Sequence, residues 1–266
     1  MQILRRLKRA YVHYVSRRFR KFKIENRILR PEGKTVTEAA RLINTLMEIG
    51  RAGRDNYLEV GVEYGYTFAN VLSHEKHAVD PNLRFNKRIK PLKWKLHETT
   101  SDDFFHSFDK SVKFDVVFLD GLHTSEQTYE DFRNCLPHLK NESIVIIDDT
   151  IPSDEFSANP DQEMSYRLRL EAGSPGDGSW HGDVFKVIVA LNSINSLDLR
   201  MATISDLNNP KTVIWVETNK SWPGQLPKMP EIKSSYADFF AKGHIDKSFN
   251  PMAEQEFYNL FTPGKS

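Results

Sequence analysis

The sequence predicts an α/β fold with a mainly parallel sheet that helices cover on both faces. Short apolar runs alternate along the chain with segments of helical periodicity, which is typical of this class. Two runs, residues 114–120 and 143–149, are largely apolar on both faces, as expected of central parallel strands. The last two predicted strands, 199–204 and 212–217, follow each other closely enough to form an antiparallel hairpin, so the last strand should run antiparallel.

The composition is that of a globular protein and excludes several classes of protein. A length of 266 residues, with 39% hydrophobic and 27% charged residues, suits one domain with additional segments. The net charge of +1 gives no overall field that would attract nucleic acid. A single cysteine, Cys135, excludes an intramolecular disulfide and a cysteine-built zinc site, and it fits a cytoplasmic location. No apolar run reaches the roughly 18 residues of a transmembrane helix.

The N-terminal segment is strongly basic. Residues 1–23 contain no Asp or Glu, and their apolar residues fall at helical spacing, which predicts a helical N-terminal extension over 1–33. Such a helix could dock on its own domain, contact an anionic membrane surface peripherally, or serve as an organelle transit peptide. The basic N-terminus and the aromatic C-terminal tail could also mediate contacts in a homo-oligomer.

The elements of the first half follow from periodicity and capping. An apolar stripe between Thr35 and Ile49 predicts a helix packed on the sheet, capped by Thr35 or Thr37. A run of Ser and Asp at 101–103 should cap the helix that follows the third strand. In chain order the predicted elements are a helix at 35–49, a strand at 57–60, a helix at 67–73, strands at 78–79 and 94–97, a helix beginning near Phe104, a strand at 114–120 and a helix at 126–139.

The second half begins with a long connection. Residues 150–181 are rich in Pro, Gly, Ser and Asp, and a loop of this length in a compact domain predicts a lid. A helix at 182–192 should follow, with the main domain extending over 34–220. The tail, 221–266, carries two aromatic helical patches at 236–241 and 253–261 and so predicts a C-terminal helical extension.

The stretch from Tyr57 to Asp80 predicts a binding site for a nucleoside. It reads as strand, glycine turn, helix and second strand, with Asp80 at the end. Such a unit places a nucleoside at the carboxyl ends of its strands, where Asp80 can accept hydrogen bonds from ribose hydroxyls. Gly61 and Gly65 let the backbone pass close to the ligand. The third glycine of the dinucleotide fingerprint is missing, so a pyrophosphate should fit poorly.

Carboxylates follow both central strands. Asp120 ends one strand, and Asp148 with Asp149 end the next. Because neighbouring parallel strands end at the same edge, we expect three acids to converge there and to repel one another. An all-oxygen set of this kind suits a hard divalent cation such as Mg²⁺. His123, three residues after Asp120, has an ordinary pKa of about 6.5 and is a candidate general base.

The glycine turn together with Asp80 resembles the first motifs of class I S-adenosylmethionine-dependent methyltransferases, a Rossmann-like family. The resemblance implies a methyltransferase domain over 34–220. It also implies that the turn holds the methionine end of the cofactor, that the acid after the second strand binds the ribose, and that two residues after the third strand lie near the adenine. These cofactor-binding residues are Glu59, Gly61, Gly65, Asp80, Ser101 and Asp102.

Residues 118–124, 146–149 and 180–186 look like a group of small-molecule O-methyltransferases associated with sugar modification. They are also similar to metal-dependent O-methyltransferases that act on macrolide sugars. The resemblance implies that three aspartates bind Mg²⁺, that the histidine is the general base, and that the acceptor is a hydroxyl of a sugar or glycan. The residues in question are Asp120, Asp148, Asp149 and His123. In the macrolide enzymes the first member of the acidic pair is often Glu, so this sequence departs from them there.

Other assignments stay open at the level of sequence. Asp183 should cap the helix that it precedes, and Lys186 could reach an anionic group of the substrate. Trp180 and His181, at the end of the lid, could stack on a sugar face. A catechol-like acceptor shares the vicinal oxygens of a sugar diol. A dehydrogenase and a non-catalytic nucleoside-binding module are the further alternatives.

Overall fold

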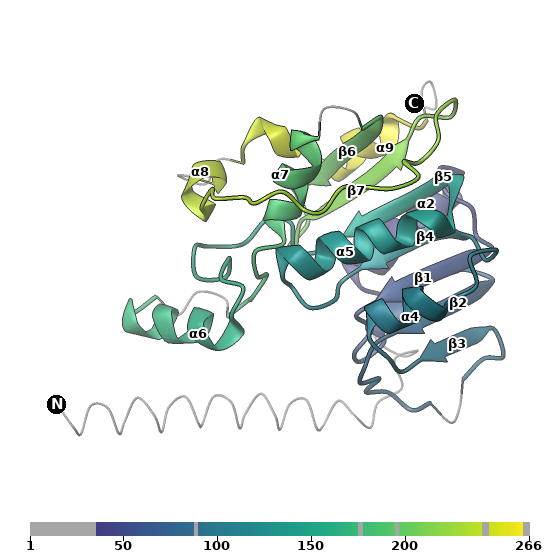
Figure 1. Cartoon of the computed structure of the whole chain (residues 1–266), viewed down its shortest axis with the longest axis horizontal. Coiled ribbons are helices and arrows are strands. Elements are labelled where there is room, and N and C mark those ends of the chain that lie inside the picture. Colours follow the sequence, from purple (N-terminus) through teal and green to yellow (C-terminus); the bar gives the residue numbers. More distant parts are fainter. Residues whose placement is uncertain (1–35, 88–89, 175–177, 195–196, 241–244, 263–266) are drawn as a thin grey trace.

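The computed structural model describes residues 36–87, 90–174, 178–194, 197–240 and 245–262, so the predicted basic extension at 1–33 lies outside it. The described residues contain one eight-stranded sheet of order β3-β2-β1-β4-β5-β7-β6-β8 (Figure 1). The strands are β1 Asn56–Val60, β2 Glu75–Val79, β3 Trp94–His97, β4 Phe114–Leu119, β5 Leu139–Ile147, β6 Leu199–Ile204, β7 Lys211–Val216 and β8 Pro251–Met252.

The direction of the strands confirms the predicted fold class. The strands β1 to β5 are mutually parallel, whereas β7 runs antiparallel to both β5 and β6. The chain starts at β1 and builds outward to β2 and β3, and then returns to place β4 and β5 on the other side of β1. Strand order therefore reverses between β1 and β4, and in sheets of this type ligands bind beyond the carboxyl ends at such a point.

Helices cover both faces of the sheet (Figure 1). One face is packed by α4, α5 and α7, and the other by α2, α3 and α9. The helices are α2 Glu38–Glu48, α3 Tyr66–Asn70, α4 Ser101–Ser107, α5 Ser125–Cys135, α6 Gln162–Glu171, α7 Phe185–Ser193, α8 Tyr236–Phe240 and α9 Glu254–Asn259, with 3-10 turns at Leu136–His138 and Lys247–Phe249. Among the residues described, every helix is too short or too polar to span a bilayer.

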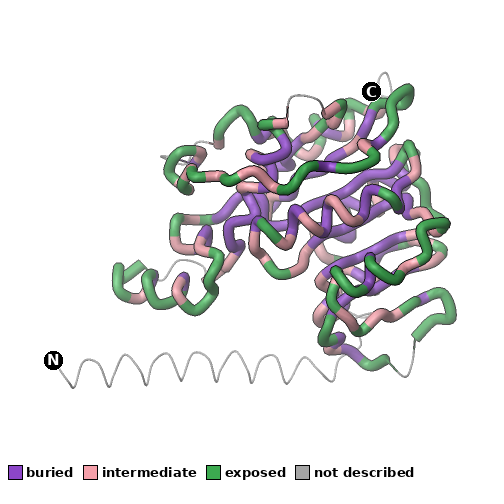
Figure 2. The backbone as a smooth tube through the Cα atoms, viewed as in Figure 1, coloured by how far each residue is buried: buried purple, intermediate pink, exposed green. Residues whose placement is uncertain are grey.

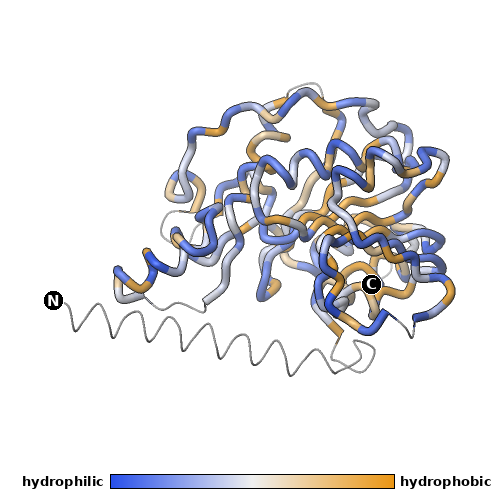
Figure 3. Tube along the Cα trace, turned by 60° about the horizontal axis from the view of Figure 1, so that its bottom comes forward, coloured by the Kyte–Doolittle hydropathy of each residue, from blue (hydrophilic) through white to orange (hydrophobic). Residues whose placement is uncertain are grey.

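The central strands alternate strictly between the two cores. Val117 and Leu119 of β4 join the core under α5 and α7, while Val116 and Phe118 join the core under α2. This period of two is the expected result of strands buried on both faces. The buried backbone accordingly lies along the strands (Figure 2), where hydrophobic residues also gather (Figure 3).

Several predicted boundaries differ from the structure for local reasons. The helix α5 ends at Cys135 rather than near 139, because Pro137 lacks the N–H that another turn would need. The predicted lid loop, 150–181, contains the helix α6, whose N-cap is Asp161. Figure 1 shows α6 standing apart from the helices that cover the sheet. Most of α6 is exposed, so the sequence has no strong apolar stripe there.

The predicted C-terminal extension returns to both faces of the sheet. Phe240 of α8 belongs to the core under α5 and α7, and Phe257 of α9 belongs to the core under α2. Between them β8 pairs in parallel with β6, a strand of two residues that the sequence did not predict. The extension therefore completes both cores of the domain.

Three histidines lie within an aromatic cluster beneath α4. The rings of His77 and His97 stack with centroids 5.3 Å apart, and His77 Nδ1 lies 3.2 Å from His97 Nε2. Phe104 and Phe114 pack against these rings. Burial, together with the neighbouring His77 and Lys90 charges, lowers the pKa of His97 to about 4. Burial likewise lowers the pKa values of His77 and His138.

This cluster predicts acid sensitivity of the fold. In the unfolded chain, a histidine binds a proton as the pH falls below about 6.5, whereas His97 in the folded protein is protonated only near pH 4. The free energy of unfolding therefore decreases as the pH falls from about 6.5 to about 4. We expect His97 to account for about 1–2 kcal/mol of lost unfolding free energy at pH 5. In urea denaturation, His97→Gln, which keeps a polar partner for His77, should lose less stability than the parent between pH 7 and pH 5. Equal losses in both proteins would contradict this account.

Candidate functional site

A cleft of about 1400 Å³ opens beyond the carboxyl ends of β1, β4 and β5. Its volume exceeds the roughly 300–1,000 Å³ of a typical pocket for one small molecule, so it has room for two ligands. The cleft brings together every residue that the sequence predicted for the site. These lining residues are Glu59, Gly61, Gly65, Asp80, Ser101, Asp102, Asp120, His123, Asp148 and Asp149.

The glycine turn is shaped by a close approach of two backbones. Gly61 has a φ of 87°, and a Cβ there would lie 1.8 Å from the carbonyl oxygen of Asp120. Only glycine lets the turn after β1 lie directly against the end of β4. Gly65, with a φ of 72°, is the N-cap of α3 and packs on the ring of Phe85. The turn therefore fixes the position of Asp120 as well as the floor of the cleft.

Glu59 is an internal anchor of this turn. Its side chain is buried and accepts a hydrogen bond of 2.5 Å from the hydroxyl of Tyr57. Burial raises the pKa of Glu59 to about 8, although the Tyr57 hydrogen bond and the Lys76 charge oppose the shift. Lys76 is itself buried and donates to the carbonyl oxygens of Phe68, Ala69 and Val71, which close the end of α3.

Asp80 joins the end of β2 to the glycine turn. Its Oδ2 accepts from the backbone N–H of Glu63 at 2.8 Å, and its Oδ1 accepts from that of Asn82 at 2.6 Å. Both oxygens keep a further lone pair for a ligand. The carboxylate is therefore rigid, buried to 8% exposure, and placed at the wall of the cleft.

A polar wall formed by α4 and α5 lies beyond Asp80. Thr100 is the N-cap of α4, so Ser101 and Asp102 occupy its first turn. The amide of Gln127 donates to Ser101 Oγ, Asp102 Oδ1 and Asp131 Oδ1 at 3.0 to 3.3 Å. Burial raises the pKa of Asp131 to about 6, although hydrogen bonds from Ser101 and Gln127 oppose the shift. Gln127 and Asp131 also line the cleft and were not predicted.

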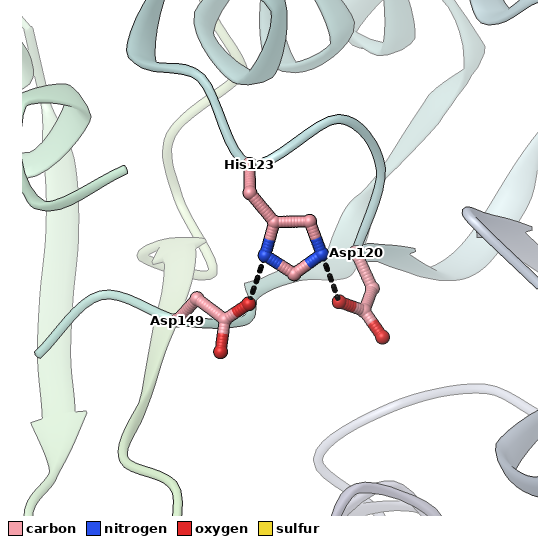
Figure 4. Close-up of side chains that lie close together, drawn as sticks. All are labelled: Asp120, His123 and Asp149. Carbon is pink, nitrogen blue, oxygen red and sulfur yellow. Dashed lines mark ion pairs between the residues drawn. The ribbon is translucent and has the colours of Figure 1, made fainter. Parts of the chain in front are cut away.

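Asp120, His123 and Asp149 converge at the opposite side of the cleft (Figure 4). The Nδ1 of His123 forms an ion pair with Asp149 Oδ2, and its Nε2 lies 3.8 Å from Asp120 Oδ1. His123 and Asp149 both adopt positive φ angles, 58° and 60°. Non-glycine residues in this region store backbone strain, and such strain often marks a functional site.

Asp148 points to a different set of partners. Its Oδ1 accepts from Lys211 Nζ at 2.8 Å, from Asn209 Nδ2 at 3.0 Å and from the N–H of Asp149 at 2.8 Å. Lys211 opens β7 and its side chain is only 4% exposed. Of the three aspartates predicted to bind a cation, Asp148 is the one whose Oδ1 is already occupied by these donors. The groups whose ligating atoms lie within 4.8 Å of one another are Asp120, His123 and Asp149.

The electrostatics of this cluster fit a cation. Desolvation in the cleft, with the charges of Asp148 and Asp149, raises the pKa of Asp120 well above its ordinary value. This shift occurs although 32% of the Asp120 side chain remains exposed. Burial would raise the pKa of Asp149, but the hydrogen bond from His123 lowers it. Burial would lower the pKa of Lys211, but the charge of Asp148 raises it. A divalent ion beside Asp120 and Asp149 would relieve the remaining repulsion.

The C-terminal end of the predicted lid segment, 150–181, packs against this cluster. Gly182 has a φ of 64°, and a Cβ there would lie 1.6 Å from the carbonyl oxygen of His123. The ring of Trp180 stacks on that of His123 at 4.9 Å, and its Nε1 donates to Asn159 O at 2.7 Å. His181 Nε2 lies 3.8 Å from Asp149 Oδ1. The sequence placed Trp180 and His181 near the acceptor, and the structure places both against catalytic candidates.

Asp183 has a role other than the predicted cap. The helix α7 begins at Phe185, and Asp183 instead accepts from the N–H and the hydroxyl of Ser125, at the start of α5. Lys186 pairs with the same carboxylate at 2.9 Å. This network holds the end of the lid to the loop that carries His123.

Lys211 and Asn209 are the functional candidates that sequence reasoning missed. One signal was present, because a lysine opens a strand that is otherwise apolar. The strand β7 pairs with β5 so that Thr212 lies opposite Ile147, which brings Lys211 beside Asp148. That register is a tertiary feature, and the local sequence does not specify it.

Comparison with known proteins finds a family model that matches part of the chain. Residues 58–150 match the model of a family described as a methyltransferase domain. No curated protein sequence matches the chain.

Many solved structures resemble this chain at low identity. One is the O-methyltransferase TomG of tomaymycin synthesis from Streptomyces achromogenes, with 14% identity, 69% of this chain and 81% of that chain covered, and a TM-score of 0.45. Another is an O-methyltransferase from Bacillus cereus, with 15% identity, 69% of this chain and 82% of that chain covered, and a TM-score of 0.42. A third is the methyltransferase PaMTH1 from Podospora anserina, with 12% identity, 74% of this chain and 86% of that chain covered, and a TM-score of 0.44. Likenesses at this level do not identify a substrate.

The close approach at Gly61 predicts a large effect of one methyl group. Gly61→Ala would place Cβ against the Asp120 carbonyl and force a positive φ on alanine, which should cost about 3 kcal/mol of unfolding free energy. Gly224→Ala is the matched control, since nothing lies within 4 Å of its Cβ position and its φ is not positive. Urea denaturation of both variants measures the difference. A Gly61→Ala protein as stable as the control would show that the turn can move away from β4.

Proposed function

We propose that this chain, which contains a class I S-adenosylmethionine-dependent methyltransferase domain, transfers the methyl group to a hydroxyl oxygen of a sugar or glycan. The observation that carries the proposal is the position of His123. An imidazole that is fixed by a carboxylate faces the same cleft as the glycine turn and Asp80. This arrangement supports a proton acceptor directed at a nucleophile beside the cofactor.

The cleft suits the cofactor chemically. Glu59, Asp80 and Asp120 line the cleft at the ends of β1, β2 and β4, and a positively charged sulfonium there would favour the ionised form of the buried acids. Asp80 is held rigidly with free lone pairs, as recognition of two ribose hydroxyls requires. The wall of Ser101, Asp102 and Gln127 offers both donors and acceptors to an adenine edge.

His123 is suited to remove the proton of the acceptor. An Nδ1–H directed at Asp149 leaves Nε2 as a lone-pair acceptor facing the cleft. Asp149 orients the ring and stabilises the imidazolium that forms when the proton is taken, the same division of roles as in a His–Asp pair of hydrolases. Burial alone would lower the pKa of His123, but the hydrogen bond and charge of Asp149 raise it overall.

Asp120 and Asp149 would hold a divalent cation such as Mg²⁺. Such an ion would bind acceptor oxygens and make a hydroxyl more acidic. Mg²⁺ sites in proteins often use only one or two carboxylates and complete their shell with water and substrate. Alignment of the acceptor oxygen with the methyl group is the remaining task of the protein.

The lid and the size of the cleft support a polar acceptor. Ser153, Gln162, Ser179 and Trp180 line the lid side of the cleft, and an aromatic ring among hydroxyls suits a sugar face. A catechol is the alternative acceptor, because it presents vicinal oxygens in the same way. The direct test is titration with S-adenosylmethionine with and without Mg²⁺, followed by a mass-shift screen of sugars, glycans and catechols. Methylation of catechols alone would replace the sugar in this proposal.

Asp80 should decide binding of the cofactor. Asp80→Ala removes both the ribose acceptor and the anchor of the turn, so the Kd for S-adenosylmethionine should rise at least about 100-fold. Asp80→Asn keeps one oxygen and should lie between the alanine variant and the parent. Calorimetric titration measures the affinities, and circular dichroism checks the fold. An unchanged Kd in Asp80→Ala would refute the nucleoside assignment.

His123 should decide turnover and leave cofactor binding intact. His123→Gln removes the proton acceptor and should reduce kcat by about 10²–10⁴-fold with an unchanged Kd for S-adenosylmethionine. A parallel assay of the parent after EDTA treatment separates the base from the cation. Full activity after EDTA would remove the cation from the mechanism, whereas a fully active His123→Gln would remove the base.

A further inference from the structure

Lys211 supplies a fixed positive charge inside the acidic cluster. Its Nζ lies 2.8 Å from Asp148 Oδ1, and the two side chains are 4% and 10% exposed. A second donation, to the carbonyl oxygen of Asn209 at 2.9 Å, keeps the ammonium in place. A buried lysine that is paired and hydrogen-bonded in this way is held as part of the interior.

Asp148 has little capacity left for another ligand at the bonded oxygen. Three donors, Lys211, Asn209 and the N–H of Asp149, already converge on Oδ1. By contrast, Asp120 has no hydrogen-bond donor on its carboxylate among those described, and 32% of its side chain is exposed to the cleft. The neighbouring carboxylate of Asp149 is shared by His123 and Asn209. His181, whose Nδ1 is buried without a hydrogen-bond partner among the described residues, adds an unsatisfied polar group beside it.

We propose that Lys211 is a positioning residue that acts as a built-in counter-cation: it makes Asp148 a structural anion and confines the divalent-cation site to Asp120 and Asp149. The proposal rests on the function proposed above, and it replaces the three-aspartate set by two carboxylate ligands. Asn209 Nδ2 donates to Oδ1 of both Asp148 and Asp149, whereas Lys211 donates to Asp148. Among the described residues, the ligating atoms that lie within 4.8 Å of one another come from Asp120, His123 and Asp149. The cation then lies next to His123, where the acceptor hydroxyl is deprotonated.

Mn²⁺ alone is the probe, and its binding is followed by electron paramagnetic resonance without substrate. The double variant Asp148→Asn/Lys211→Met removes the ion pair together, so no buried charge is left unpaired. Its Kd for Mn²⁺ should stay within about threefold of the parent. Asp120→Asn should weaken Mn²⁺ binding by at least about tenfold, because it removes a ligand. Lys140→Met is the control, since Lys140 pairs with Asp115 at the other end of β4.

The single variant tests the counter-charge itself. Lys211→Met leaves Asp148 buried with no cation, so its Tm should fall further than that of the double variant. Addition of Mn²⁺ should recover more of that Tm in the single variant than in the parent, because Asp148 then becomes available to the ion.

Two results would overturn the proposal. One is a double variant that loses Mn²⁺ as severely as Asp120→Asn, which would make Asp148 a ligand. The other is a parent that binds no Mn²⁺. Titration with S-adenosylmethionine is measured separately on the same proteins. A parent protein that does not bind S-adenosylmethionine would refute the proposed function. A parent that binds S-adenosylmethionine but gives either of these two Mn²⁺ results would refute only the role of Lys211.

Discussion

The structure of the active edge depends on one constraint, the convergence of three carboxylates at the ends of β4 and β5. Parallel strands in register bring Asp120, Asp148 and Asp149 to the same edge, and desolvation makes their repulsion costly. Hydrogen-bond donors from other parts of the fold reduce this repulsion. Lys211 reaches in from the antiparallel strand, and His123 from the loop after β4. The reversal of β7 is therefore part of the site, because it is what places a lysine beside the acids.

Two glycines connect this edge to the rest of the cleft. Gly61 lets the cofactor turn lie against the carbonyl of Asp120, and Gly182 lets the end of the lid lie against the carbonyl of His123. Each contact is closer than any side chain would permit. The glycine turn, Asp120, His123 and the C-terminal end of the predicted lid are thus fixed relative to one another through backbone packing.

The sequence predicted the strands and the residues at their ends, because both depend on local pattern. Apolar runs and the acids that follow them need no knowledge of tertiary structure, and they located Asp120, Asp148 and Asp149. What the sequence left undetermined was pairing across distance. Lys211 lies beside Asp148 only because of the register of β7 on β5, and the short strand β8 exists only because β6 offers it an edge. The exposed helix α6 escaped prediction for the opposite reason, since it buries too little for a pattern to form.

The two adjacent aspartates, Asp148 and Asp149, have the same chemical identity but different partners in the folded protein. In the sequence Asp148 and Asp149 are equivalent, and a shared role as cation ligands is the natural expectation. The positive φ of Asp149 separates them, because it turns one carboxylate toward His123 while the other meets Lys211. The two side chains are similarly buried, 10% and 7% exposed, and both line the cleft, but one pairs with an ammonium group and the other with an imidazole. The register of β7 brings the lysine to one carboxylate, and the loop after β4 brings the histidine to the other, so two long-range contacts distinguish residues that the sequence leaves equivalent.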